Sequence, residues 1–212
     1  MKIAIIGAGS VGTALGVSWS KAGHDIVFGV RDANSANARA AANAVARGAL
    51  VAAVGEAAGP AEIVVLATPW EQTEAAIAAA GGLAGKTVID CTNPLAYTDG
   101  RLGLAIGFDT SGGEQVAAWA PEAHVFKALN QVGFLAMEDA KFPDGFAAMF
   151  VAGDDAGRKP AVLSLMTALG FEAVDAGPLR ISRLLEPYAM LWIHLAINQG
   201  LGRDFAFSLL RR

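Results

Sequence analysis

Three glycines near the N-terminus constrain the fold of this chain more than any other feature of its sequence. Residues 2–6 form a short apolar run typical of a β-strand, and Gly7-x-Gly9-x-x-Gly12 follows it directly. In such a motif the first glycine permits a tight turn, the second lets a pyrophosphate approach the backbone, and the third lets the next helix pack closely on the strand. The N-terminus of that helix attracts phosphates. The motif therefore predicts a dinucleotide site, and a glycine turn without a ligand is the alternative.

The order of apolar runs along the chain predicts an α/β fold. Strands are expected at residues 2–6, 25–29, 50–53, 63–67, 86–91 and 124–129, and helices at residues 13–22, 34–47, 71–80 and 113–120. Alternation of apolar strands with helices is typical of a parallel sheet covered on both faces. We therefore predict a Rossmann-type, doubly wound, mostly parallel sheet that forms a dinucleotide-binding domain in residues 1–145.

The remaining residues, 146–212, are expected to extend this sheet rather than to form an independent domain. Strands are predicted at residues 146–152 and 171–174, with a helix at 156–169 between them. The chain from Leu179 to the C-terminus is very apolar and is predicted to be mostly helical. The helix after Pro187 has too few polar residues for a solvent-facing surface, so we expect it to form the seam of a homodimer.

The end of the second predicted strand bears on which dinucleotide binds. Enzymes that use NAD usually place Asp or Glu there, about 20 residues beyond the glycines, to bond the ribose 2′-hydroxyl. Val30 occupies that position here, and Arg31 follows with a planar guanidinium that suits a 2′-phosphate. We therefore predict NADP(H). NAD is the alternative, with Arg31 merely solvated and Asp32 holding a ribose hydroxyl.

Three further predicted strands end in residues suited to binding a nicotinamide. In open α/β sheets, ligands bind beyond the carboxyl ends of the strands. Proline fixes the backbone of a loop at such a place, and an asparagine side chain can bond a carboxamide. Ordinary turn chemistry is the alternative, because Pro and Asn are common in loops. The residues concerned are Thr68, Pro69 and Trp70 after the fourth strand, Asn93 and Pro94 after the fifth, and Asn130 and Gln131 after the sixth.

Other polar or reactive side chains are assigned structural roles. Lys127 lies inside an apolar strand, where a buried amine is costly without a partner, so we expect its ammonium to reach solvent rather than to be catalytic. Cys91 is expected to be a small buried hydrophobe. His24, His124 and His194 do not have the spacing of metal ligands, so no metal is assigned.

Composition excludes several classes of protein. A chain of 212 residues that is 54% hydrophobic and 17% charged is not intrinsically disordered, and a net charge of −4 gives no general footprint for nucleic acid. A single Cys excludes an internal disulfide framework. The longest uncharged stretch is shorter than the about 20 apolar residues of a membrane span, and residues 1–6 lack a signal-peptide core. We expect a cytoplasmic protein that binds neither nucleic acid nor a membrane.

The sequence lacks the Tyr-x-x-x-Lys pair of the short-chain reductases. The residue four positions after Tyr97 is Arg101, and the one four positions after Tyr188 is Trp192. Hydride transfer to a flavin-like ring requires stacked rings in close register rather than a strong acid or base. We therefore expect direct hydride transfer, without a catalytic acid–base residue.

Several segments resemble the coenzyme F420-dependent NADP oxidoreductase family. The most specific match is Asp175-Ala176-Gly177-Pro178-Leu179 with residues 182–186. Less specific matches are residues 2–7 with the glycine loop, Ala67-Thr68-Pro69-Trp70, residues 153–155 and the ending at 200–204. The resemblance implies a reductase that exchanges hydride between NADP(H) and a 5-deazaflavin, usually as a homodimer paired through C-terminal helices. It also implies a set of cofactor-binding residues: Ser10, Val11 and Arg31 at the phosphates, and Ala67, Thr68, Pro69 and Trp70 at the nicotinamide.

Two departures from the family pattern leave the acceptor open. The family often has Ser or Thr before the Arg and Lys a few residues later, whereas Val30 and Ser35 stand here. Residues 88–94 and 126–130 are more similar to bacterial relatives and to the cytoplasmic domain of the six-transmembrane metalloreductases, which pass hydride to an ordinary flavin. We therefore expect a small-molecule acceptor, coenzyme F420 or FMN or FAD. An NADPH-dependent reductase of a small carbonyl or imine, and a non-catalytic NADP(H) sensor, are the alternatives.

Overall fold

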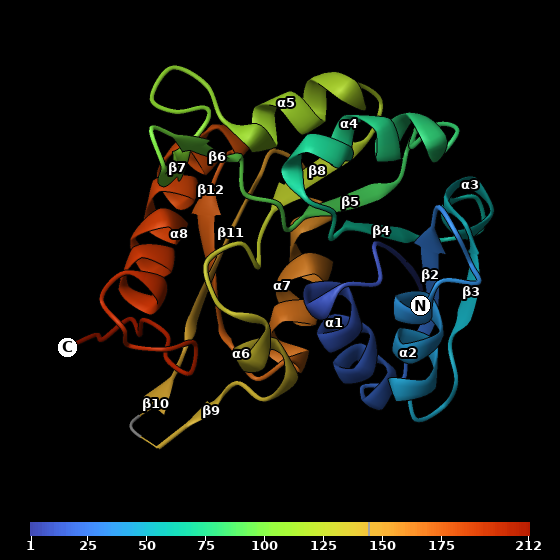
Figure 1. The fold of residues 1–212 in the computed structure, drawn as a ribbon, viewed down its shortest axis with the longest axis horizontal. Helices are drawn as coiled ribbons and strands as arrows, with labels where there is room; N and C mark the ends of the chain where they lie inside the picture. Colours follow the sequence, from blue (N-terminus) through green and yellow to red (C-terminus); the bar gives the residue numbers. More distant parts are fainter. Residues whose placement is uncertain (144) are drawn as a thin grey trace.

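An eight-stranded sheet forms the centre of the computed structural model, which describes residues 1–143 and 145–212 (Figure 1). Its strands are β1 (Lys2–Ile6), β2 (Asp25–Val30), β3 (Leu50–Ala53), β4 (Ile63–Leu66), β5 (Thr87–Asp90), β8 (His124–Lys127), β11 (Ala148–Gly153) and β12 (Glu172–Gly177). Their order is β12-β11-β8-β5-β4-β1-β2-β3. The six strands from β3 to β8 are parallel, and chain order reverses between β1 and β4, which confirms the predicted doubly wound, mostly parallel sheet.

The last two strands join the edge of this same sheet. β11 pairs with β8 in antiparallel orientation and with β12 in parallel orientation. Residues 146–212 therefore add to the sheet of the first 145 residues.

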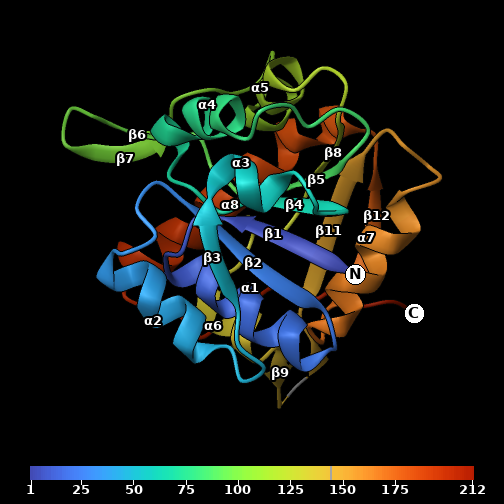
Figure 2. The same cartoon turned by 90° about the vertical axis from the view of Figure 1, so that its right-hand side faces the viewer.

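Helices cover both faces of the sheet (Figure 2). They are α1 (Ser10–Lys21), α2 (Ala36–Ala44), α3 (Val54–Ala58), α4 (Trp70–Ala79), α5 (Gly112–Trp119), α6 (Phe134–Glu138), α7 (Lys159–Ala168) and α8 (Ser182–Ile197). Within β1, Ile3 and Ile5 pack into the core beneath α1 and α7, while Ala4 and Ile6 pack into the core beneath α3 and α4. Because successive side chains of a strand point to opposite faces, a strand covered on both sides is apolar throughout.

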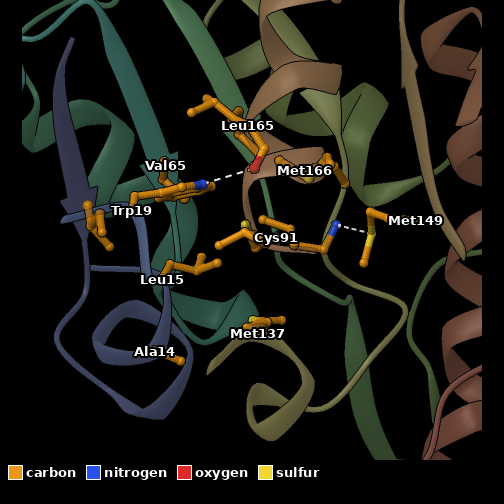
Figure 3. Close-up of a cluster of buried hydrophobic side chains, with 14 of the residues drawn as sticks. Ala14, Leu15, Trp19, Val65, Cys91, Met137, Met149, Leu165 and Met166 are labelled. Atoms are coloured by element: carbon orange, nitrogen blue, oxygen red, sulfur yellow. Dashed lines mark hydrogen bonds between the residues drawn. The ribbon is translucent and has the colours of Figure 1, made fainter. Parts of the chain in front are cut away.

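A buried tryptophan ties the N-terminal helix to the C-terminal extension. The Trp19 indole is fully buried, and its Nε1 donates to the main-chain oxygen of Leu165, 3.1 Å away, so α1 is fixed to α7 (Figure 3). Cys91 lies in the same core and is 9% exposed, which confirms that it is buried. Burial raises the pKa of its thiol.

The C-terminal prediction was wrong beyond Ile197, where α8 ends. Gly200 and Gly202 have positive φ angles of 72° and 76°, which interrupt a helix. The chain then returns to the sheet: Phe205 stacks on Trp192 with ring centroids 5.1 Å apart, and the Phe207 oxygen accepts from the Ala148 N–H. The tail is thus a strap held by aromatic side chains.

Two hairpins were also missed. β6 (Leu95–Thr98) pairs with β7 (Arg101–Leu104), and β9 (Lys141–Phe142) pairs with β10 (Gly145–Phe146), so the strand predicted at residues 146–152 is divided between β10 and β11. The helix predicted at residues 34–47 is shorter at both ends. The Ser35 hydroxyl accepts from the Ala38 N–H and begins α2 at Ala36, and the extended backbone of Val45, with φ −78° and ψ 110°, ends it after Ala44. Within the described residues, no helix is long and apolar enough to span a membrane.

Candidate functional site

The three glycines of the loop between β1 and α1 have different roles in the structure. Gly7 has a φ of +113°, and a Cβ there would lie 2.6 Å from the Ala67 oxygen. A Cβ on Gly12 would lie 2.0 Å from the Gly7 oxygen. A Cβ on Gly9 would meet no atom within 4 Å, so packing within the protein does not require glycine there. The space above the Gly9 backbone is therefore open, which close approach of a phosphate group would require.

The N-terminus of α1 is also suited to an anion. Gly9 is its N-cap and provides no side-chain cap, and the first turn holds no acidic residue. Ser10 is exposed and Val11 is half-buried. The first N–H groups of a helix lack intrahelical acceptors and carry partial positive charge, so this end of α1 can bind phosphate oxygens.

At the end of β2, the loop leaves Arg31 exposed. The neighbouring carboxylate has a local partner, because Asp32 Oδ1 accepts from the Asn34 N–H at 2.8 Å and closes a turn. Arg31 and Asp32 are both exposed, and one oxygen of the Asp32 carboxylate is engaged in this turn.

A cleft of about 290 Å³ lies beyond the ends of β4 and β5. It brings together residues of three separate loops that the sequence assigned to one site. Those that line it are Val11 from the glycine loop, Ala67, Thr68, Pro69 and Trp70 after β4, and Asn93 after β5, together with Glu71, Cys91, Thr92 and Leu95. Pro94 is buried behind the cleft, where its Cδ packs near the start of α5.

The Thr68 hydroxyl is oriented by Thr73, a residue that the sequence analysis missed. The two hydroxyl oxygens are 2.9 Å apart, and Thr73 Oγ1 donates to the Pro69 oxygen at 3.1 Å. Since a hydroxyl has a single proton, Thr68 must donate to Thr73. The Thr68 hydroxyl can therefore only accept a hydrogen bond from a ligand, and the N–H of an amide is a suitable donor.

Trp70 has a structural contact as well as a place in the cleft. Its ring lies 5.2 Å from the ring of Trp119, centroid to centroid, which packs α4 against α5. The side chain is half-buried, so one part of the indole supports the wall and another part lines it.

Asn93 and Asn130 bind each other across the ends of β5 and β8. Asn93 Nδ2 donates to the Asn130 main-chain oxygen at 2.9 Å, and Asn130 Nδ2 donates to Asn93 Oδ1 at 3.1 Å. Asn130 is buried, whereas Asn93 is partly exposed in the cleft. The preceding Leu129 has a φ of +65°, an uncommon value for leucine that turns the chain here.

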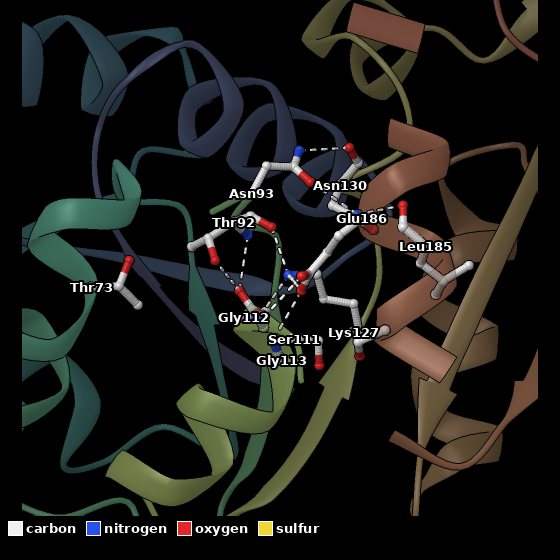
Figure 4. A network of polar contacts seen from close by, with 12 residues as sticks. Thr73, Thr92, Asn93, Ser111, Gly112, Gly113, Lys127, Asn130, Leu185 and Glu186 are labelled. Atoms are coloured by element: carbon white, nitrogen blue, oxygen red, sulfur yellow. Dashed lines mark hydrogen bonds and ion pairs between the residues drawn. The ribbon is translucent and has the colours of Figure 1, made fainter. Parts of the chain in front are cut away.

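Beneath this pair lies a buried charge network, and it corrects the prediction for Lys127 (Figure 4). The lysine does not reach solvent: it is 0% exposed, and its Nζ lies 2.9 Å from both Asp90 Oδ2 and Glu186 Oε1 and 2.7 Å from the Thr92 oxygen. The two carboxylates raise the pKa of Lys127, against the opposing effect of burial, which is the largest single influence.

One half of this network had a signal in the sequence. Asp90 and Lys127 are aligned on the neighbouring parallel strands β5 and β8, so the predicted strands place opposite charges side by side. Glu186 had no such signal, because its position depends on how α8 docks.

The residues that resembled a known family in the C-terminal half hold α8 in place. Asp154 Oδ1 accepts from the Leu179 N–H at 2.9 Å, and Asp175 accepts from Lys159 Nζ at 2.8 Å and from the Gly177 N–H at 2.8 Å. The chain between β12 and α8 is thereby fixed, which directs Glu186 into the network.

A doubly wound sheet with an open, glycine-lined helix N-terminus at its point of strand reversal defines a Rossmann-type dinucleotide-binding protein. The model of the family described as "NADP oxidoreductase coenzyme F420-dependent" matches residues 2–94. An F420-dependent NADP reductase of Methanocaldococcus jannaschii is 31% identical over 210 residues, which cover 93% of each chain. The crystal structure of a proposed F420-dependent NADP-reductase from Arthrobacter sp. FB24 has a TM-score of 0.90 and 33% identity over the whole of both chains. This chain belongs to that family of NADP-dependent oxidoreductases, as its residues indicated.

A further relative is larger. Metalloreductase STEAP3 of Rattus norvegicus is 27% identical over 185 residues, which are 87% of this chain and 36% of that protein. The chain therefore spans about a third of the length of this relative, and the likeness extends to one part of it.

Proposed function

We propose that this protein transfers a hydride between NADP(H) and a flavin-type acceptor, either coenzyme F420 or FMN or FAD. The single observation that carries the choice of acceptor is the cleft itself, which is open and largely apolar, and whose lining, among the residues that the structure describes, includes no buried acid poised to donate a proton. Family membership supports NADP(H) as the dinucleotide.

The residues fit NADP(H) from one end to the other. The main-chain N–H groups of Gly9, Ser10 and Val11 would bind the pyrophosphate, and Gly7 and Gly12 shape the loop that presents them. Arg31 would bind the 2′-phosphate. Thr68 and Asn93 would hold the carboxamide, with Ala67, Pro69 and Trp70 forming the wall, and with Pro94 and Asn130 behind Asn93. When bound, the nicotinamide supplies or accepts the hydride.

The cleft favours a flavin-type ring over a small carbonyl or imine, because reduction of the latter calls for a proton donor beside the nicotinamide. Glu71 and Cys91 are the titratable side chains among the described residues that line it. The Cys91 thiol is buried, and burial raises its pKa. Glu71 is exposed in the first turn of α4.

The hairpin beside the cleft supports the same choice. Leu95 lines the cleft, and the strand register places Leu95, Tyr97, Leu102 and Leu104 on one face of the hairpin. This face is apolar and continues outward from the cleft, with Tyr97 76% exposed. A flat, largely apolar ring stacked on the nicotinamide would extend in this direction.

We also propose that two copies pair through α8. Its buried face, which includes Leu185, Ala189 and Trp192, packs on the rest of the chain. Leu184 and Leu191 on its outer face remain 65% and 49% exposed, an arrangement typical of an interface rather than of a surface in water.

The test is the anaerobic oxidation of NADPH, followed optically, with coenzyme F420, FMN and FAD offered separately. Turnover with the deazaflavin alone would assign the family's named activity, and turnover with FMN or FAD would assign a flavin reductase. We expect Glu71→Gln to retain the rate. A large loss in that variant, or silence with all three acceptors despite tight NADPH binding, would refute the proposal in favour of a carbonyl or imine substrate or of a sensor.

A further inference from the structure

We infer that Lys127 and Glu186 are positioning residues for the nicotinamide end of the cofactor site, so that helix α8 supports that end from behind. The inference rests on the proposed function only for the identity of the ligand. It follows from the buried network and from what that network holds (Figure 4).

The ammonium of Lys127 has no proton to spare. An ammonium has three N–H donors, and each of them has one acceptor here: Asp90 Oδ2 and Glu186 Oε1 at 2.9 Å and the Thr92 oxygen at 2.7 Å. Lys127, Asp90 and Glu186 are all at most 1% exposed. A group enclosed in this way has a single position, so the three acceptors that are hydrogen-bonded to it are held in place as well.

Glu186 brings two further elements into the network. Its Oε2 accepts from the Gly112 N–H at 2.9 Å, and its Oε1 accepts from the Gly113 N–H at 3.0 Å. These are the first residues of α5, whose positive end stabilises a carboxylate. Two carboxylates therefore share one ammonium, and the end of α5 compensates for the second negative charge.

The network holds the main chain directly behind the cleft. Lys127 binds the Thr92 oxygen, while Asp90 Oδ1 accepts from the Thr92 N–H at 2.9 Å and from the Thr92 hydroxyl at 2.7 Å. The next residue is Asn93, which lines the cleft. The N–H, the hydroxyl and the carbonyl oxygen of Thr92 are thus all engaged by the network, which fixes the position of Asn93.

Helix α8 holds Asn93 by a second route. Asn130, which pairs with the Asn93 amide, also donates from Nδ2 to the Leu185 oxygen at 3.2 Å. Adjacent residues of α8, Leu185 and Glu186, therefore reach the two supports of Asn93. After these contacts Asn93 keeps one N–H and one lone pair on Oδ1, which are complementary to a carboxamide.

The alternative is that Glu186 only fastens α8 to the protein and has no effect on the ligand. A second ion pair between the same helices serves as a matched control for that alternative. Arg183 in α8 pairs with Glu114 in α5, with its Nε 2.8 Å from Oε2 and its Nη2 2.7 Å from Oε1. This pair joins the same two helices as Glu186 does. It makes no contact with Thr92, Asn93 or Asn130.

The experiment compares the affinities of NADP⁺ and of 2′,5′-ADP, which lacks the nicotinamide, in wild-type protein, Glu186→Gln, Asn130→Ala and the control Arg183→Met. Calorimetric titration measures binding, and a urea denaturation curve shows that each variant is folded. We expect Glu186→Gln and Asn130→Ala to weaken NADP⁺ about tenfold, the factor for one modest hydrogen bond, with the affinity for 2′,5′-ADP unchanged. Arg183→Met should change neither affinity.

Equal losses for both nucleotides, or wild-type affinities in either folded variant, would overturn the inference. Asn130→Ala keeps all three buried charges and removes the second route by which α8 holds Asn93, so the support from α8 can still be refuted if Glu186→Gln does not fold. A protein that binds NADP⁺ but reduces none of the offered acceptors contradicts the proposed function alone, because these affinities need no acceptor. A wild-type protein that binds neither nucleotide overturns both.

Discussion

Replacing Gly9 by Ala should separate binding from folding, because the protein leaves room for the added methyl group, whereas the proposed pyrophosphate would occupy the same space. Gly9 has φ −83° and ψ −169°, values that alanine adopts without strain. Its Cβ would meet no atom of the protein within 4 Å. Gly9→Ala should therefore leave the free energy of unfolding nearly unchanged. Alanine restricts the unfolded chain, which stabilises the fold by about 0.4–1 kcal/mol, but it is less favourable than glycine at the N-cap of α1, which offsets that gain.

The same methyl group would stand where, in the proposed complex, a phosphate oxygen reaches the main chain. A hydrogen bond to a charged group is worth about 1.5–3 kcal/mol, so the loss of one should raise the Kd of NADPH about ten- to a hundredfold. Gly12→Ala is the contrasting variant. Its Cβ would lie 2.0 Å from the Gly7 oxygen, so the loop or the start of α1 must move, and we expect a large loss of stability.

Urea denaturation and titration of NADPH fluorescence test the pair of variants. A Gly9→Ala protein that is clearly less stable than the wild type would show that this glycine serves the fold. A stable Gly9→Ala protein with wild-type affinity for NADPH would show that no phosphate approaches the main chain at Gly9. Either result refutes the reasoning.

Three other variants probe the ribose, the surface charges and the outer face of α8. Arg31→Ala should weaken NADPH far more than NADH in the same titration, and equal losses would remove the 2′-phosphate assignment. The hydrogen bond from Arg183 is the main reason that the pKa of Glu114 lies below its ordinary value. The pair therefore stabilises the fold at any pH above the ordinary pKa of a glutamate, and this stabilisation is lost as the pH falls through the lowered pKa of Glu114. Arg183→Met should accordingly lower the Tm at neutral pH and match the wild type in acid. Leu191→Lys should convert a dimer into a monomer by light scattering at micromolar concentration, and a monomeric wild type would contradict the proposed seam.

The part of the site that lies within one stretch of chain could be predicted from the sequence. Gly7 and Gly12 are required sterically where β1 turns into α1, whereas Gly9 leaves open space there. The strand before these glycines and the helix after them were both identifiable by pattern. The ends of β4 and β5 could be predicted for the same reason, because parallel strands bring their carboxyl ends to one edge of the sheet.

The charge network could be predicted only in part, because its members come from distant parts of the chain. A lysine in an apolar strand is ambiguous until its neighbours are known, and the prediction that the Lys127 ammonium reaches solvent was wrong. Alignment of β5 with β8 would have supplied Asp90. No local pattern supplies Glu186, since its carboxylate arrives on a helix whose place depends on the turns at Asp154 and Asp175.

The C-terminal tail was misjudged for a different physical reason. An apolar segment with several aromatic residues satisfies the hydrophobic requirement of a helix, and it satisfies equally well that of an extended strap. The outcome is decided by Gly200 and Gly202, which turn the chain, and by the stacking of Phe205 on Trp192. Periodicity cannot distinguish these arrangements when glycine follows a helix so closely.

The two ends of the proposed cofactor site are therefore built in different ways. The phosphate end consists of the first main-chain N–H groups of α1, which lack intrahelical acceptors, and of the exposed Arg31; these groups would gain partners when an anion binds. At the nicotinamide end the polar groups behind the cleft are already paired, and Asn93 keeps only the bonds that face the ligand. A preformed end of this kind loses little side-chain entropy on binding, which suits the part of the cofactor that must hold one orientation for hydride transfer. It also gives α8 a constraint that packing alone does not impose, because a small shift of Leu185 and Glu186 displaces Asn93.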